Sequence, residues 1–148
     1  MKLWQSALCV VLLAVCLPMH GKKVYDWVLT GRAVNTDASV HTFEVRVDSI
    51  DFRDDLTRLY GRFTGTPHVA IKVMEAVLTT DSECRLAATD SDGFELDRYF
   101  QFEEIPSFNI ELDFAATRPA QVIDLTLITA KGVLSYKFGS KPNNFESH

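Results

Sequence analysis

Hydrophobic residues recur at every second position over most of the chain, which is the period of a β-strand rather than of a helix. The segment FNIELDF (108–114) alternates without a fault, so its apolar residues are predicted to face inward while Asn109, Glu111 and Asp113 face outward. In FELDRYFQF (94–102) the same spacing predicts a strand whose phenylalanines face inward and whose Glu95 and Asp97 face solvent. Alternation of this kind is typical of strands with one buried face.

Three segments depart from simple alternation. In HTFEVRVDSIDF (41–52) the apolar positions change parity, which predicts a bulge near Asp48-Ser49. HVAIKVMEAVLTT (68–80) is apolar on both parities and predicts a central strand covered on both faces. DDLTRLYGRF (54–63) is ambiguous, because Asp54 or Asp55 could cap one helical turn, or the segment could be a further strand.

These segments, separated by turns, predict an all-β protein. We expect an antiparallel β-sandwich of seven to nine short strands with at most one short helix, and a barrel as the alternative. Ala130-Lys131-Gly132 predicts a tight hairpin in which glycine adopts a positive φ. Residues 22–140 are expected to form a single domain, and residues 141–148 a flexible tail.

The amino terminus has the layout of a secretory signal peptide. Lys2 precedes an apolar run that Pro18 ends, and the run is too short to cross a bilayer. We therefore predict a signal peptide over residues 1–21, cleavage after Gly21, and a secreted, extracellular protein without a membrane span. The alternative is a bacterial lipoprotein acylated at Cys16, although Val15 stands where such a motif requires a smaller residue.

Charge is concentrated in the middle of the chain. Removing residues 1–21 leaves 14 basic and 20 acidic residues, and residues 81–113 hold ten of these acids against two arginines. Such an acidic segment argues against nucleic acid as a partner. It favours a basic protein, a divalent cation, or simply a solvated polar surface.

The acidic segment contains a weak calcium candidate and a lone cysteine. DSDGFELD offers Asp90, Asp92 and Glu95 as oxygen ligands, but Asp-Gly is also a common turn between strands, and the turn is the favoured interpretation. Cys84 is the only cysteine that remains after residue 21. We expect it to be a buried structural residue, with an interchain disulfide as the alternative, because neighbouring acids disfavour a reactive thiolate.

No sequence motif for catalysis is present. The chain lacks an H-E-x-x-H metal motif, a G-x-S-x-G serine elbow and a glycine-rich phosphate loop, so no cofactor is predicted. RLYGRF (58–63) is the one cationic aromatic stretch, and on a strand Arg58, Tyr60 and Arg62 share a face. These three residue types suit a partner contact, although arginines paired to Asp54 or Asp55 are the simpler interpretation.

We therefore predict a small secreted β-sandwich that acts as a non-catalytic extracellular binding module. Its partner would be an extracellular protein or a second copy of itself. The first alternative is a carrier of an apolar small molecule or lipid between the sheets, which the ten phenylalanines could line. The second alternative is a hydrolase whose site is not visible in the sequence.

Overall fold

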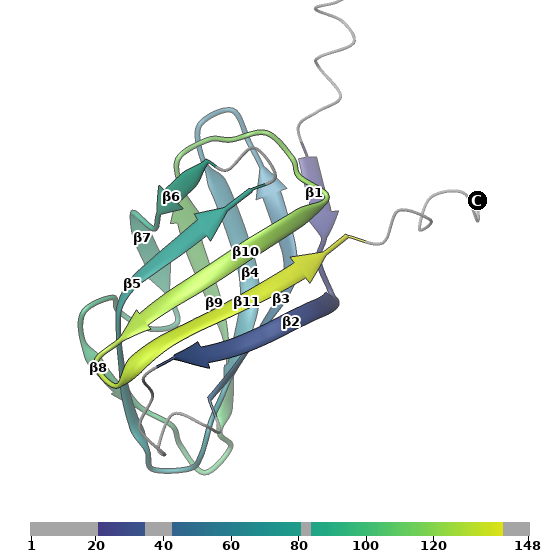
Figure 1. The fold of residues 1–148 in the computed structure, drawn as a ribbon. Coiled ribbons are helices and arrows are strands. Elements are labelled where there is room, and N and C mark those ends of the chain that lie inside the picture. Colours follow the sequence, from purple (N-terminus) through teal and green to yellow (C-terminus); the bar gives the residue numbers. More distant parts are fainter. Residues whose placement is uncertain (1–20, 35–42, 81–83, 141–148) are drawn as a thin grey trace, which may run out of the picture.

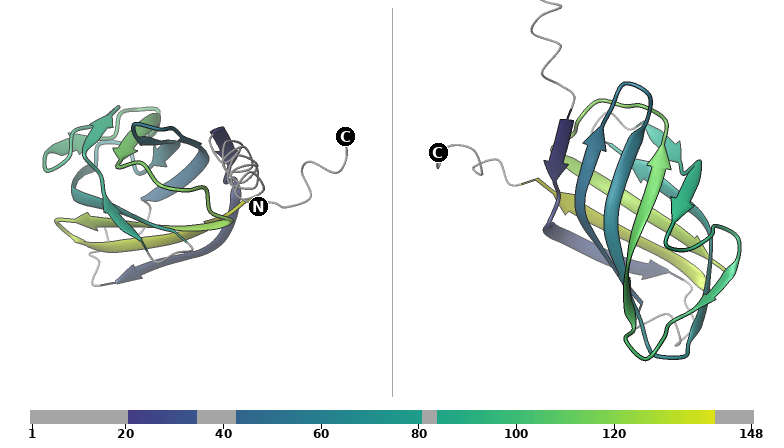
Figure 2. Two further views of the ribbon diagram at one scale, coloured as in Figure 1. Left: turned by 90° about the horizontal axis from the view of Figure 1, so that it is seen from above. Right: turned by 180° about the vertical axis from the view of Figure 1, so that it is seen from behind.

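The computed structural model describes residues 21–34, 43–80 and 84–140, which form two antiparallel sheets packed face to face (Figures 1 and 2). The sheets do not close, so the sandwich prediction is confirmed and the barrel alternative is wrong. No helix occurs in these ranges. The first sheet has the order β1 (Gly21–Val24), β3 (Glu44–Phe52), β4 (Thr57–Thr64), β9 (Ser107–Phe114), β7 (Asp90–Asp92).

The second sheet carries both the carboxyl-terminal hairpin and the longest strand. Its order is β2 (Trp27–Val34), β11 (Gly132–Gly139), β10 (Val122–Thr129), β5 (Ala70–Thr79), β6 (Arg85–Ala87), and β8 (Tyr99–Gln101) also pairs with β5. The described residues form eleven strands, more than the predicted number, because β1, β6, β7 and β8 are only three or four residues long. Strands this short cannot be predicted from alternation, because alternation is recognisable only over several repeats.

Two bulges explain why apolar residues change parity along the chain. In β3 the pairing with β4 skips Asp48, between Val47 and Ser49, as the sequence predicts. In β5 the pairing with β10 skips Met74. The prediction that β5 is covered on both faces is therefore wrong: its buried residues are Ile71 and Val73 before the bulge and Ala76 and Leu78 after it. An inserted residue moves the following side chains to the opposite face, which mimics two-sided burial in the sequence.

Within the ambiguous segment 54–63, residues from Thr57 onward belong to strand β4, and neither Asp54 nor Asp55 caps a helix. The inward side chains of β4 and β9 meet the second sheet in a core that is rich in phenylalanine. Phe63 lies at the centre of this core, and its ring centroid is 4.9 Å from those of Phe43 and Phe94. Burial of these rings is the main favourable contribution to folding in a chain with a single described cysteine.

The predicted strand over residues 94–102 is only partly present. Residues 94–98 form a turn, and the strand begins at Tyr99. Gly93 and Asp97 adopt positive φ angles of 90° and 60°, which break the extended chain. Phe94 and Phe102 are nevertheless buried, as the alternation predicts, because the turn brings both rings back to the core.

The hairpin between β10 and β11 agrees with the sequence. Gly132 has a φ of 136°, and Thr129 pairs with it across the turn. The predicted signal peptide, with Cys16, and the predicted flexible tail lie outside the described residues, apart from Gly21 at the start of β1.

Candidate functional site

The outer face of the five-stranded sheet is the surface on which the predicted partner-binding residues lie. Side chains of β4 alternate between the core and this face, so Arg58, Tyr60 and Arg62 point outward together, as predicted. Strand pairing sets their neighbours: Arg58 stands between Asp51 and Asp113, and Tyr60 between Ser49 and Glu111. Because these strands pair in fixed register, the positions of the outward side chains follow from the sheet itself.

Arg58 is fixed by acids of β9. Its Nε and Nη2 atoms donate to the two carboxylate oxygens of Asp113 at 2.7 and 3.0 Å, and Glu111 lies 3.7 Å from Nε. The hydrogen bond to Asp113 and the charge of that carboxylate raise the pKa of Arg58 above its usual value. The expected pairing of Arg58 with Asp54 or Asp55 is therefore wrong, because Asp113 lies directly opposite Arg58 on β9 and binds it through two hydrogen bonds. Arg58 links two strands and is not free for a partner.

Arg62 is in the opposite situation. Its side chain is exposed and lies directly between Arg46 on β3 and Asn109 on β9. Among the described residues, neither Arg62 nor Arg46 forms an ion pair. Like charges directly opposite one another destabilise a sheet, so this pair is not explained by the stability of the fold.

Tyr60 is half-buried and has a defined neighbour. The Nζ atom of Lys22, on edge strand β1, lies 4.5 Å from the centroid of the Tyr60 ring. A cation at this distance is attracted by the face of the ring. The ring is thereby oriented toward Lys22 and stays partly exposed at the surface.

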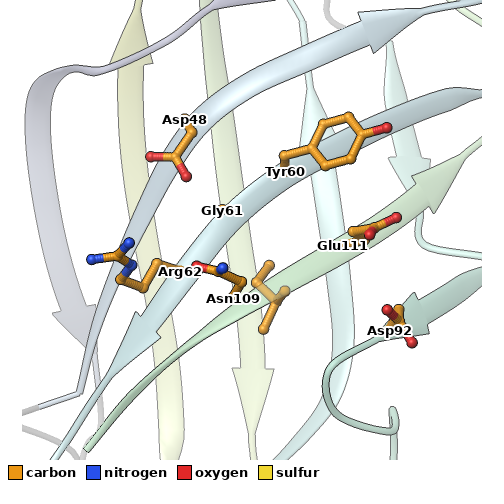
Figure 3. Close-up of a pocket in the computed structure, with 8 residues that line it drawn as sticks. Asp48, Tyr60, Gly61, Arg62, Asp92, Asn109 and Glu111 are labelled. Carbon is orange, nitrogen blue, oxygen red and sulfur yellow. The ribbon is translucent and has the colours of Figure 1, made fainter.

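A depression of about 330 Å³ lies on the outer face of the five-stranded sheet, next to Tyr60 and Arg62 (Figure 3). Gly61 has no side chain and that of Ile110 is buried in the core, so these two residues present backbone to the depression. The bulge in β3 gives an outward position to Asp48, which is exposed. The remaining lining side chains come from four strands and are all polar: Asp48, Tyr60, Arg62, Asp92, Asn109 and Glu111.

The sequence points to only part of this site. Tyr60 and Arg62 are found from the cationic aromatic stretch, whereas Asn109 and Glu111 are recognisable only as outward positions of a regular strand. Asp48 is missed because a bulge predicted from parity does not say where the extra side chain points. Asp92 is singled out in the sequence, but as a calcium ligand and not as part of this depression.

The calcium candidates do not gather into one site. In the described ranges, no three His, Cys, Asp or Glu side chains are arranged to hold a metal ion. Glu95 pairs with Arg98 at 2.6 Å, while Asp90 and Asp92 lie opposite Asp113 and Glu111 on the outer face. The favoured interpretation, a turn at Asp92-Gly93, agrees with the structure. This turn requires glycine, because a Cβ atom at position 93 would lie 2.4 Å from the Asn109 carbonyl oxygen.

Cys84 is exposed, so the prediction of a buried structural cysteine is wrong. It directly precedes β6, a three-residue strand at the edge of the six-stranded sheet, where only Leu86 is partly buried. An edge strand this short covers few of its own side chains, and its first residues stay at the surface. The interchain disulfide stays a prediction.

Two features of the described residues bear on the alternatives to a binding module. His68 is exposed and lies 3.2 Å from Glu104 at the surface, while His41 and His148 lie outside the described residues. Between the sheets, the phenylalanine rings contact one another at centroid distances of 4.9 to 6.0 Å, as a packed core requires. The polar side chains that line the depression lie on the outer face of the five-stranded sheet, not between the sheets.

The fold and this surface define a class of protein: an open, two-layered antiparallel β-sandwich with a polar depression on one outer face. No protein-family model matches the chain, and no match is found among curated proteins. Across the described ranges there is no helix long and apolar enough to cross a membrane.

Proposed function

We propose that the chain is a secreted, non-catalytic binding module that contacts an extracellular partner protein through the outer face of its five-stranded sheet. The amino-terminal export pattern supports the location. The observation that carries the proposal is the contrast between two arginines of the same strand face. Arg58 is fixed by Asp113, whereas Arg62 is exposed, faces Arg46 and borders the depression.

The contrast matters because an ion pair within the protein and a contact with a partner make different demands on an arginine. A bidentate, partly buried pair such as Arg58–Asp113 orders the sheet. Arg62 forms no ion pair with another described residue, and arginine and tyrosine are both enriched among binding hot spots. Tyr60 and Arg62 would therefore contribute the contact, on a platform that Arg58 makes rigid.

Site-specific photo-cross-linking tests this proposal. A photoreactive phenylalanine analogue replaces Arg46 in one protein, because Arg46 is exposed directly opposite Arg62, and Lys137 in a control, because Lys137 is exposed on the other sheet. Both proteins are irradiated in extracellular fluid of the organism that produces the chain. We expect a specific adduct from position 46 and none from position 137, and we expect Arg62→Ala to weaken binding of the captured protein about tenfold. Equal labelling from both positions, or none from either, would refute the proposal.

A further inference from the structure

The depression on the outer face combines side chains of both charges with neutral hydrogen-bonding groups. Carboxylates come from Asp48, Asp92 and Glu111, the guanidinium from Arg62, and an amide from Asn109. Tyr60 adds an aromatic wall. Together these groups supply donors and acceptors around a floor of backbone.

This mixture selects among classes of ligand. An anion would meet Arg62 together with three carboxylates, and a cation would meet the carboxylates together with Arg62. A hydroxyl group both donates and accepts a hydrogen bond, so a neutral ligand with many hydroxyls can use every polar group in the depression. Two adjacent hydroxyls also match the paired oxygens of a carboxylate and the paired N–H groups of a guanidinium.

We infer that the depression is a carbohydrate-binding site, in which one or two sugar rings of an extracellular glycan hydrogen-bond to Arg62, Asp92, Asn109 and Glu111. The inference rests on the proposed function and names what the face recognises on its partner. The volume of about 330 Å³ is at the small end for ligand sites, which suits a unit of this size.

The strand positions of the site are set before a ligand arrives. Its side chains project from neighbouring strands of one sheet, and Arg58 contacts Glu111 at 3.7 Å while bound to Asp113. The backbone of the site therefore need not rearrange on binding, and Glu111 loses little freedom. A shallow site with few contacts still gives weak binding, with a dissociation constant on the order of 1 mM for a single sugar unit. Detection therefore requires either multivalent display or a method suited to weak complexes.

The face supplies two matched pairs of variants. Arg62 lines the depression and Arg46, directly opposite on β3, does not, so Arg62→Ala and Arg46→Ala make the same change in charge. Likewise Asp92 lines the depression and Asp90, two residues earlier on β7, does not, so Asp92→Asn and Asp90→Asn form the second pair. All four positions are exposed, and thermal unfolding of each variant checks that folding is unchanged.

The test uses the full secreted protein on an array of neutral, amino, sialylated and sulfated glycans in multivalent display. The best oligosaccharide is then titrated into isotope-labelled protein and followed by NMR. We expect a neutral glycan to bind, Arg62→Ala and Asp92→Asn to weaken its binding at least about tenfold, and Arg46→Ala and Asp90→Asn to change its binding less than about twofold.

Three results would overturn the inference: no glycan binds, only amino, sialylated or sulfated glycans bind, or each control variant loses as much affinity as its partner. The photo-cross-linking experiment then distinguishes a protein contact from a glycan contact. An adduct from position 46 that persists after enzymatic removal of glycans supports a protein contact and eliminates the carbohydrate site. If no adduct forms and no glycan on the array binds, both the binding face and the carbohydrate site are eliminated.

Discussion

Replacing Phe63 with alanine is expected to be among the most damaging single changes in the core. Phe63 is fully buried and contacts four other aromatic rings, at centroid distances of 4.9, 4.9, 5.9 and 6.0 Å. Removing a buried phenyl ring costs about 3–5 kcal/mol, and the upper part of this range applies where neighbouring side chains cannot collapse into the cavity. Two of these rings lie on strands, Phe100 on β8 and Phe108 on β9, so we expect limited collapse and a loss of about 4 kcal/mol.

Equilibrium unfolding in urea, followed by the fluorescence of the half-exposed Trp27, measures this loss. With a dependence on urea of about 2 kcal/mol per molar, the midpoint should fall by about 2 M. Since single domains have a total stability of about 5–15 kcal/mol, Phe63→Leu serves as a milder variant if Phe63→Ala does not fold. Its expected loss is about 1–2 kcal/mol.

The matched control is Ile105→Ala, because Ile105 is 80% exposed and should contribute almost nothing. A midpoint shift below about 0.5 M for Phe63→Ala, or an equal shift for Ile105→Ala, would refute the reasoning that this ring cluster carries the core.

Four further outcomes are expected. Burial and the nearby charge of Glu44 raise the pKa of Tyr136 above its ordinary value of 10.0, so its contribution to stability is complete below pH 10 and is lost as the pH rises further. The unfolding free energy of Tyr136→Phe, which also loses the hydrogen bond to the Phe43 carbonyl, should accordingly fall less steeply than that of wild type above pH 10; parallel curves would contradict this. The thiol of Cys84 should react at once with a thiol reagent in the reduced native protein, and a dimer on a non-reducing gel should disappear with Cys84→Ser; slow labelling would argue against its exposure. Gly61→Ala should cost about 1–3 kcal/mol in thermal or urea unfolding, since the added Cβ atom would lie 2.4 Å from a backbone oxygen, and a neutral result would show that β3 can shift. Mass spectrometry of protein collected from the medium should show an amino terminus at residue 22, while retention in the cell would contradict export.

The prediction of the fold succeeded where the chain alternates regularly. Strands β4 and β9 each place one set of residues in the core and the other outside, so period alone assigns their faces. The same approach failed for β5 because a bulge at Met74 and burial on both faces produce similar patterns in a sequence. It also failed for residues 94–98, where Asp97 adopts a positive φ that its residue type permits but does not demand.

The candidate site was predicted less completely than the fold. Arg58 and Arg62 occupy equivalent positions in the sequence pattern, since both lie on the outward face of one strand. Strand register separates them: Arg58 falls opposite Asp113 and becomes fixed, while Arg62 falls opposite Asn109 and forms no ion pair with another described residue. A shift of two residues between β4 and β9 would place Arg62 opposite Glu111 and Arg58 opposite Ala115 without altering any local pattern.

The sequence by itself determined the class of the fold, the inward face of the regular strands and the turn at Gly132, because these features depend on the period of side chains and on local backbone geometry. Tertiary structure alone decided the strand order, the exposure of Cys84 and the depression around Gly61. These features depend on which strands become neighbours and in what register, and such long-range pairings leave no periodic trace in a single chain.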